Sequence, residues 1–330
     1  MQPFAEMSQE DQVAYIQSLV PQFAADFELD VKDIENINLG FNASFKVTTK
    51  SDEIYAFRIN INSKKKAEEL AAEAQWLERI AHLDSLEAPV PLQARSGEFF
   101  TSVWSDLLEK DLLCLGYSFI EGTIPGEDPT KEDYLQIGRN MAHLHESTLD
   151  WMPTGSASLP YLNTTLLSSS SNYPDSRIDP ELYTMIQDLM YATDEVHKRL
   201  SAESPLQPIH ADLHAENVVR KPDGIQAVID FDDCGIGFSL QDFAISSFYL
   251  RDESPFEEYV FEGYSEIRPV PDFSQEDFEL LVISRQIVLL NDLLHVTTAE
   301  EREFVPTYLE YTRKRFQHFY ETGVFKLIRD

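Results

Sequence analysis

The sequence contains few cysteines and no long apolar run, and each shortage excludes a class of protein. Its 330 residues include two cysteines, Cys114 and Cys234, which lie far apart. Neither a disulfide scaffold nor a cysteine-based zinc site is therefore expected. The N-terminus lacks a basic start followed by an apolar segment, so no signal peptide is predicted. No apolar stretch reaches the ~18 residues that a membrane-spanning helix needs, and the expected location is the cytoplasm.

Basic side chains are also scarce. There are 26 of them against 58 acidic ones, which gives a formal net charge of −32. A surface of this sign repels nucleic acid and anionic lipid, so we expect neither nucleic acid nor membrane as a partner. The acidic surplus would attract a cationic substrate, but solubility alone explains it and is the explanation we favour. The oligomeric state does not follow from the sequence.

Glycine and proline, at 12 and 17 residues, are too few for a repetitive or disordered chain, whereas 43% of the residues are hydrophobic. The first third is rich in strand patterns. An amphipathic helix is predicted near 8–27, with Ser8 as its cap, and a second helix near 64–82. Alternating apolar residues predict strands near 35–40, 43–49, 53–60, 98–105 and 112–120.

After Gly122 the pattern becomes mostly helical. Helices are predicted over 130–148, 179–201, 240–250 and 274–296, and a polar, serine-rich loop over 156–176. The turn signal Pro222-Asp223-Gly224 predicts a hairpin with strands near 217–220 and 225–230. The expected fold class is therefore α+β, with a small antiparallel-sheet lobe (1–117), a short connection (118–122) and a larger helical lobe (123–330). A cleft between two lobes is a common ligand site.

Three polar residues flank the predicted hairpin. Asp212 and Asn217 precede its first strand or begin it, and Asp230 follows its second strand. A hairpin brings its two ends together, so these side chains are expected to meet in space. Phosphoryl transfer needs oxygen ligands for Mg²⁺ and a carboxylate that orients the attacking hydroxyl. We therefore assign Asp212 as the catalytic base and Asn217 and Asp230 as metal ligands.

The same stretch resembles a known family. His210-Ala211-Asp212-Leu213-His214-Ala215-Glu216-Asn217 resembles the catalytic loop of the aminoglycoside phosphotransferase and choline kinase superfamily, and Ile229-Asp230-Phe231-Asp232-Asp233 resembles its metal-binding segment. Asp242 matches the aspartate that braces the catalytic loop in that family, while His210 is expected to hold the loop by hydrogen bonds. The resemblance implies a protein-kinase-like two-lobed fold, with ATP as co-substrate and Mg²⁺ as cofactor.

Weaker matches extend the resemblance to residues 35–250. The segment from Gly40 through Asn42 to Phe45 resembles the turn that covers the nucleotide, and Glu73 resembles the helix glutamate that pairs with a phosphate-binding cation. The segment 118–122 resembles the interlobe hinge, so the resemblance implies that the adenine lies at Phe119, Ile120 and Glu121.

One position departs from the family pattern. Arg58 stands where these kinases usually carry a lysine that contacts the α- and β-phosphates. Arginine can bind phosphate in a bidentate manner, so ATP binding is retained as an expectation, and GTP is not excluded. Arg58 also leaves open a weakly active or inactive enzyme, and Lys46 on the neighbouring strand is a candidate helper. Asp232 and Asp233 could help a second metal or attract a cationic acceptor, but we favour a solvated turn.

The phosphate acceptor is the least determined feature. The resemblance places the specificity residues in the C-terminal helices, which contain Tyr259, Tyr264, Arg285, Asn291 and Asp292. We expect a small-molecule hydroxyl acceptor, and an acidic, aromatic pocket would suit an amino alcohol, an aminoglycoside or choline. The first alternative is a Ser/Thr protein kinase, because 230–242 is also similar to bacterial stress-response kinases. The second is a non-catalytic nucleotide-binding regulator, which Arg58 motivates.

Overall fold

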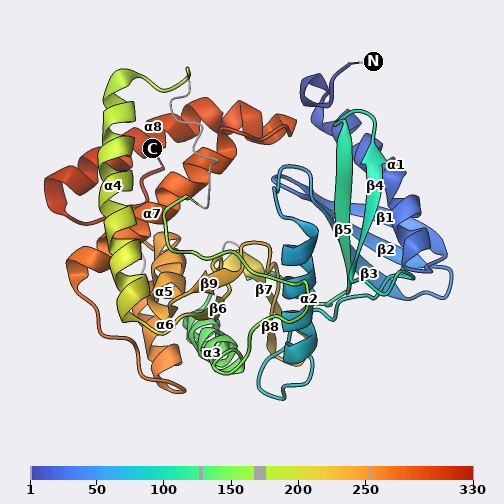
Figure 1. The fold of residues 1–330 in the computed structure, drawn as a ribbon, viewed down its shortest axis with the longest axis horizontal. Coiled ribbons are helices and arrows are strands. Elements are labelled where there is room, and N and C mark those ends of the chain that lie inside the picture. The colour runs from blue at the N-terminus through green and yellow to red at the C-terminus, as the bar shows by residue number, and fades with distance from the viewer. Residues whose placement is uncertain (1, 126–128, 167–175, 253–254, 330) are drawn as a thin grey trace.

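A computed structural model describes residues 2–125, 129–166, 176–252 and 255–329, and it has two lobes (Figure 1). The first lobe is built around one antiparallel sheet, and the second is mostly helical. The α+β, two-lobed fold class predicted from the sequence is thus confirmed. Residues 167–175 of the predicted serine-rich loop lie outside the described residues. No helix in the described part of the chain is long and apolar enough to cross a membrane.

The first lobe carries a sheet with the strand order β1-β2-β3-β5-β4. Its elements are η1 (Phe4–Glu6), α1 (Gln9–Asp26), β1 (Val31–Leu39), β2 (Ala43–Thr49), β3 (Ile54–Ile59), α2 (Ala67–Ile80), β4 (Phe100–Ser105) and β5 (Lys110–Ser118). Ser8 caps α1 as predicted, since its hydroxyl accepts a 3.1 Å hydrogen bond from the Asp11 amide. The first strand begins at Val31, four residues before its predicted start.

The two helices of this lobe occupy different cores. Buried side chains of α1, such as Ile16 and Phe23, pack with Phe45 and Phe57 of the sheet. Helix α2 instead contributes Trp76 to the core that continues into the second lobe. In Figure 1, α2 lies between the sheet and the helical lobe. This position places the side chains of α2 next to the cleft.

The second lobe follows the segment after β5. Its elements are α3 (Lys131–Ser147), α4 (Pro180–Glu203), β6 (Gln207–Ile209), η2 (Ala215–Asn217), β7 (Val218–Arg220), β8 (Gln226–Val228), β9 (Gly235–Gly237), α5 (Ser239–Phe248), α6 (Phe256–Ser265), α7 (Gln275–Leu293) and α8 (Ala299–Thr322). The hairpin β7–β8 is present as predicted, with Val218 opposite Val228. Strands β6 and β9, which the sequence analysis did not predict, pair with each other beside it.

The segment after β5 is bonded to the hairpin. Thr123 and Arg220 exchange two backbone hydrogen bonds, of 3.0 and 2.8 Å. A Cβ atom at Gly122 would lie 2.5 Å from the Arg220 carbonyl oxygen, so a larger residue there would force the two segments apart. The close contact fixes the approach of residues 118–122 to the second lobe.

A second set of bonds joins the lobes far from that segment. The Gln12 side chain of α1 donates to the Thr297 carbonyl oxygen (3.0 Å) and accepts from the Ala299 amide (2.8 Å). The Asn62 Oδ1 atom, just after β3, accepts from the Thr297 amide at 2.8 Å. We call these contacts the α1–α8 tie. The tie therefore joins the lobes at a place distant from residues 118–123, in addition to the contacts that α2 makes with the second lobe.

Candidate active site

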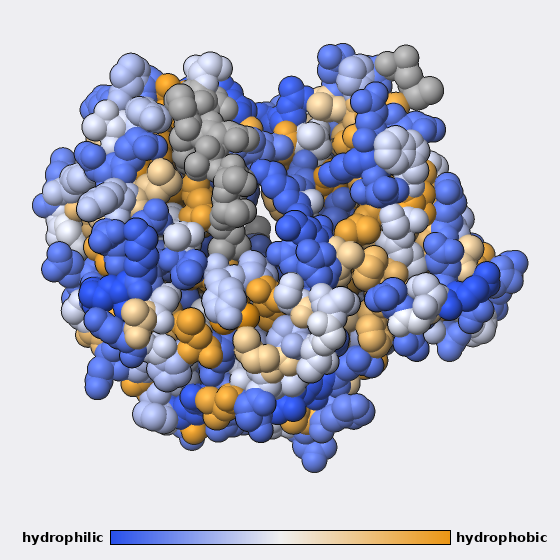
Figure 2. Space-filling model, in the orientation of Figure 1, coloured by the Kyte–Doolittle hydropathy of each residue, from blue (hydrophilic) through white to orange (hydrophobic). Residues whose placement is uncertain are grey.

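Two connected cavities lie between the lobes. One, of about 550 Å³, has mostly apolar walls and reaches from residues 118–122 to Arg58. The other, of about 350 Å³, extends from Arg58 past Asp212 to the start of α8. Both are lined by Ser44, Arg58 and Asp230. The space-filling view shows a hollow between the lobes with hydrophilic side chains at its edge (Figure 2). The cleft thus has an apolar half and a polar half that meet at Arg58 and Asp230.

The hairpin brings the three polar residues of the catalytic motif together. The Ile229 amide donates to the Asn217 carbonyl oxygen (2.9 Å), which places Asp230 beside Asn217. The Asn217 Nδ2 atom donates to the Asp212 Oδ2 atom at 3.0 Å and to the Asp212 carbonyl oxygen at 2.8 Å. Because Nδ2 is engaged in this way, the amide oxygen of Asn217 is the atom that remains for a cation.

Asp242 and His210 hold the catalytic loop from behind. The buried Asp242 carboxylate accepts hydrogen bonds from the His210 amide (3.2 Å), the Ala211 amide (2.6 Å) and His145 Nε2 (2.9 Å). The His210 side chain is buried, and its Nε2 atom lies 3.1 Å from the Ile229 carbonyl oxygen. These bonds link the catalytic loop to α5, α3 and the segment that carries Asp230.

Asp230 lies where the two cavities meet. Its side chain is 48% exposed, and within the described residues it accepts no hydrogen bond; Arg58 Nη1 lies 3.7 Å away. Its φ is 61°, a conformation that non-glycine residues rarely adopt and that is often found at functional sites. Desolvation in the cleft, together with nearby carboxylates, raises the pKa of Asp230 to about 7, although Arg58 opposes this.

The donor set fits Mg²⁺ better than a transition metal. Among the described residues, no three His, Cys, Asp or Glu side chains are grouped so that they could hold a metal ion. Asn217 and Asp230 offer one amide oxygen and one carboxylate. Such a pair suits Mg²⁺, because this ion commonly completes its octahedron with phosphate oxygens and water.

The Arg58 guanidinium forms an ion pair with the buried Glu73 carboxylate. Its two terminal nitrogens donate to the Glu73 carboxylate at 3.0 and 2.7 Å, and Tyr117 donates to the same carboxylate at 2.8 Å. Burial alone would raise the pKa of Glu73, but the charges of Arg58 and Lys65 outweigh it and hold this pKa below its usual range. Glu73 is therefore charged and fixes the guanidinium at the junction of the two cavities.

Lys65 is a cation that the sequence analysis missed. It follows β3, is largely buried, and its Nζ atom lies 3.9 Å from the Glu73 Oε2 atom. Lys46, the candidate helper, lies in the apolar cavity instead, 5.2 Å from the centre of the Phe119 ring. The structure therefore places Lys65, and not Lys46, in the same charge cluster as Arg58.

The interpretation of Asp232 and Asp233 as a solvated turn is wrong for the buried Asp232 and holds for Asp233, whose side chain is 44% exposed. Asp232 is 9% exposed, accepts a 2.8 Å hydrogen bond from Asn42 Nδ2 and lies 3.2 Å from Arg58 Nη2. Asp233 forms a 2.8 Å ion pair with Arg285 Nη1. Both carboxylates are held because cationic or amide side chains from other elements reach them. The Asn42 contact also fixes the 40–42 turn over the cleft.

Two of the three predicted adenine residues line the apolar cavity. Phe119 and Ile120 line the 550 Å³ cavity, whereas the exposed Glu121 side chain lines a different cavity behind the connection. Gly40, at the end of β1, lies near α8, since a Cβ atom there would be 3.0 Å from Glu301 Oε1. Phe41 and Asn42 of the 40–42 turn line the 350 Å³ cavity and not the 550 Å³ cavity, so this turn lies nearer to the second lobe than the resemblance implied.

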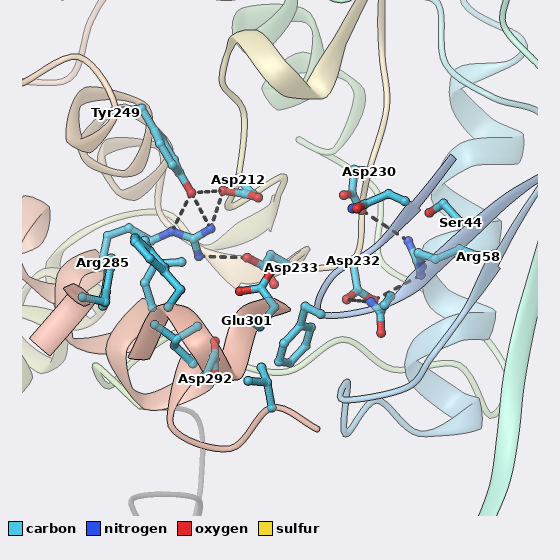
Figure 3. A pocket seen from close by; sticks show the side chains of 18 residues that line it. Ser44, Arg58, Asp212, Asp230, Asp232, Asp233, Tyr249, Arg285, Asp292 and Glu301 are labelled. Carbon is cyan, nitrogen blue, oxygen red and sulfur yellow. Dashed lines mark hydrogen bonds and ion pairs between the residues drawn. The ribbon is translucent and has the colours of Figure 1, made fainter. Parts of the chain in front are cut away.

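Asp212 has two partners that the catalytic motif does not contain. Arg285 of α7 forms an ion pair with Asp212 Oδ1, and the Tyr249 hydroxyl donates to the same oxygen at 2.9 Å (Figure 3). Burial alone would raise the pKa of Asp212, but Arg285 reverses this and holds it well below its usual range. The sequence carried one signal for Arg285: it is the only charged residue between Glu279 and Asp292. A charge in such an apolar helix indicates a buried partner.

The far end of the 350 Å³ cavity is formed by α7 and α8. Asp292 and Glu301 line it, together with an apolar and aromatic wall of Leu289, Leu293, Val296, Phe304 and Tyr308. Desolvation, together with Asp233, raises the pKa of Asp292 to about 6. Tyr264, by contrast, is a core residue whose hydroxyl lies 3.0 Å from His145 Nδ1, and it does not line the cavity.

Comparisons with known proteins agree with this geometry. A model of the phosphotransferase enzyme family matches residues 33–276. A homoserine kinase from Granulibacter bethesdensis (strain ATCC BAA-1260 / CGDNIH1) is 30% identical over 150 residues, a match that spans 44% of this chain and 43% of that kinase.

Solved structures show the fold over nearly the whole chain. A microcompartment-associated aminopropanol kinase has a TM-score of 0.69 at 21% identity, covering 96% of this chain and all of its own. An amicoumacin kinase in complex with AMP-PNP and Ca²⁺ also has a TM-score of 0.69, at 16% identity, covering 95% of this chain and all of its own. A spectinomycin phosphotransferase has a TM-score of 0.59 at 14% identity, covering 91% and 94%.

The family match covers well over half of the chain, including the catalytic loop, the hairpin and Asp242. The solved neighbours share its two-lobed arrangement from end to end. This chain therefore belongs to the phosphotransferase enzyme family.

Proposed function

We propose that this enzyme moves the γ-phosphoryl group of Mg-ATP to the hydroxyl of a small amino alcohol. The observation that carries the proposal is the cavity beside Asp212. Two of its carboxylates, Asp292 and Glu301, form no ion pair within the described residues. Asp233, in contrast, is neutralised by Arg285. A cationic acceptor would therefore find its counter-charge at Asp292 and Glu301.

The walls and size of the cavity support the same acceptor class. A volume of about 350 Å³ suits a small molecule, and the apolar side chains around it suit a carbon chain. An ammonium group next to Asp292 would also relieve the desolvation that raises the pKa of this carboxyl group. The aromatic rings of Phe304 and Tyr308 could add cation–π contacts.

The names of two relatives point in the same direction. Homoserine and aminopropanol, the acceptors named for the homoserine kinase and the aminopropanol kinase, each combine a hydroxyl with an amino group. This likeness supports an amino alcohol as the class without selecting one compound. The cytoplasmic location and the choice of ATP over GTP stay predictions.

Each half of the proposed site has a distinct task. The nucleotide would lie in the apolar cavity beside β1 and β2, with its base beside Phe119 and Ile120. Asn217 and Asp230 would hold Mg²⁺, which neutralises charge on the β- and γ-phosphates when it is bound. Arg58, fixed by Glu73, would face the phosphates, and Asp212 would receive the acceptor hydroxyl. Positioning and charge neutralisation supply most of the acceleration.

The test is ADP release from Mg-ATP and Mg-GTP with a panel of acceptors. The panel contains amino alcohols, homoserine, choline, aminoglycosides, sugars without an amino group and a generic protein. We expect turnover with amino alcohols, loss of turnover in Asp212→Asn, and a raised KM for the acceptor in Asp292→Asn. The control is Asp272→Asn, because Asp272 is exposed and lies outside the cleft.

Three outcomes would contradict the proposal. Phosphorylation of the generic protein alone would identify a Ser/Thr protein kinase. Preference for sugars without an amino group, unaffected by Asp292→Asn, would remove the role of the acidic wall. Stabilisation by nucleotide without turnover of any acceptor would favour a non-catalytic regulator.

A further inference from the structure

Arg285 is a buried charge at the centre of the transfer site. It lies in α7 and 7% of its side chain is exposed. Neither of its two acidic partners belongs to α7: Asp212 comes from the catalytic loop and Asp233 from the turn before β9. A buried guanidinium is costly unless its donors are satisfied, so the arrangement of these partners is informative.

The guanidinium is almost fully engaged. Its Nη1 atom donates to Asp233 Oδ2 at 2.8 Å, and Nη2 donates to Asp212 Oδ1 and, at 2.9 Å, to the Tyr249 hydroxyl. Its Nε atom lies 3.3 Å from the same hydroxyl. Figure 3 shows Arg285 between these three side chains. With so few donors left, Arg285 is better suited to holding its protein partners than to binding a substrate.

The two oxygens of the Asp212 carboxylate are therefore not equivalent. Oδ1 accepts from both Arg285 and Tyr249. Oδ2 accepts one hydrogen bond, from Asn217 Nδ2 at 3.0 Å, and His214 Nε2 lies 3.7 Å from it. A carboxylate oxygen accepts about two hydrogen bonds. Among the described contacts, Oδ1 is filled and Oδ2 keeps a place for one more donor.

We propose that Arg285 is a positioning residue for phosphoryl transfer, because with Tyr249 it fixes Oδ1 of Asp212 and leaves Oδ2 as the oxygen that receives the acceptor hydroxyl. The inference rests on the proposed kinase function. In the step, the acceptor O–H proton passes to Oδ2 and the acceptor oxygen bonds to the γ-phosphorus. The bond from that phosphorus to the β–γ bridging oxygen breaks, ADP leaves, and Asp212 releases the proton to solvent.

Arg285 also limits the negative charge at this point. Asp212, Asp230, Asp232 and Asp233 all lie along the cleft where the phosphates would approach. Arg58 reaches Asp230 and Asp232, while Arg285 reaches Asp212 and Asp233. Without Arg285, two neighbouring carboxylates would repel each other and the incoming phosphoryl group. Arg285 thus both orients the Asp212 carboxylate and offsets its repulsion of Asp233 and of the phosphoryl group.

The experiment compares Arg285→Ala and Arg285→Lys with the wild-type enzyme, using the best acceptor from the panel and, separately, water as acceptor in slow ATP hydrolysis. We expect Arg285→Ala to lower kcat about 100-fold or more, since misplacement of a reacting group has effects of this size. The KM for ATP should change by less than about threefold, because the nucleotide half of the site is intact. Millimolar guanidinium should restore part of kcat in Arg285→Ala, and methylammonium should not. Arg285→Lys should keep more activity than Arg285→Ala.

The matched control is Arg251→Ala. Arg251 is another largely buried arginine held by two carboxylates, Glu257 and Glu279, and it does not line the cleft. The Arg251→Ala variant should be less stable than the wild type without a selective loss of kcat, and guanidinium should not raise its turnover.

Turnover of the panel by the wild-type enzyme tests the kinase function. The ratio of the variant kcat to the wild-type kcat tests the role of Arg285. A variant that loses stability and activity together, with no response to guanidinium, would assign Arg285 a structural role only. An unchanged kcat, or a loss confined to the KM for the acceptor, would also overturn the proposal. If no acceptor in the panel is used, the same ratio measured with water as acceptor still tests it.

Discussion

Asp242 holds Ala211 in a left-handed backbone conformation. The Ala211 φ is 61°, and its amide donates a 2.6 Å hydrogen bond to Asp242 Oδ1. The other carboxylate oxygen accepts from the His210 amide and from His145 Nε2. A strained residue persists only where its surroundings over-determine it, and here a single buried carboxylate does so next to Asp212.

Asp242→Asn should therefore affect both stability and catalysis. An amide at this position turns one acceptor into a donor that faces backbone N–H groups, which should cost about 2–4 kcal/mol in the free energy of unfolding. Urea denaturation measures this loss, and kcat should fall more than the KM for ATP rises. A variant with wild-type kcat would show that the strained loop does not depend on Asp242.

Activity should require a divalent metal ion that Asp230 and Asn217 hold. We expect chelation by EDTA to abolish turnover, and Asp230→Asn to raise the Mg²⁺ concentration needed for half-maximal rate. The physical reason is the loss of a carboxylate that accepts no hydrogen bond within the described residues. The measurement is initial rate against free Mg²⁺ at saturating ATP. Unchanged Mg²⁺ dependence in both Asp230→Asn and Asn217→Ala would place the metal elsewhere.

Breaking the Arg58–Glu73 pair on one side should be more harmful than replacing both partners. Arg58→Met leaves the buried Glu73 without its main counter-charge, which should destabilise the protein by about 3–5 kcal/mol. The double variant Arg58→Met/Glu73→Leu should recover most of that stability while activity stays lost, because the phosphates still lack their cation. Thermal or urea unfolding and ATP titration separate the two effects. Wild-type ATP affinity in Arg58→Met would assign the phosphates to Lys65.

Acid should destabilise the fold through His197. Its side chain is buried, and burial lowers its pKa to about 4. Between pH 6.5 and 4 the His197 imidazole is protonated in the unfolded chain and neutral in the native state. The free energy of unfolding therefore falls as pH falls through this window, by about 3 kcal/mol in full. In His197→Phe this contribution is absent. The free energy of unfolding of the variant minus that of the wild type should therefore increase from pH 7 to pH 4.5. A constant difference would contradict the prediction.

Local patterns predicted most of the elements. Helix α1 and its Ser8 cap, the strands of the first lobe and the hairpin β7–β8 follow from apolar periodicity and turn residues, with errors of a few residues at the ends. The juxtaposition of Asp212, Asn217 and Asp230 was predictable for a related reason: a hairpin must bring its ends together. Their roles in catalysis stay predictions.

Contacts made by distant helices could not be predicted in this way. Arg285 reaches Asp212 across 73 positions of the sequence, and its direction depends on how α7 packs against α5. A run of aspartates is typical of a solvated turn, which holds for the exposed Asp233 and not for the buried Asp232. The burial of Asp232 depends on Asn42 and Arg58, which come from other elements.

The α1–α8 tie restricts the way in which the cleft can move. Phe119 and Ile120 line one end of the cleft, and Val296 lines the other end, next to the residues that Gln12 and Asn62 hold. Helix α2 adds further contacts with the second lobe, such as the hydrogen bonds that Trp76 and Arg79 donate to Ser147. A jaw-like opening about residues 118–122 alone would therefore have to break the hydrogen bonds of the α1–α8 tie. As long as the tie stays intact, ligands would exchange through a cleft whose α8 end does not open.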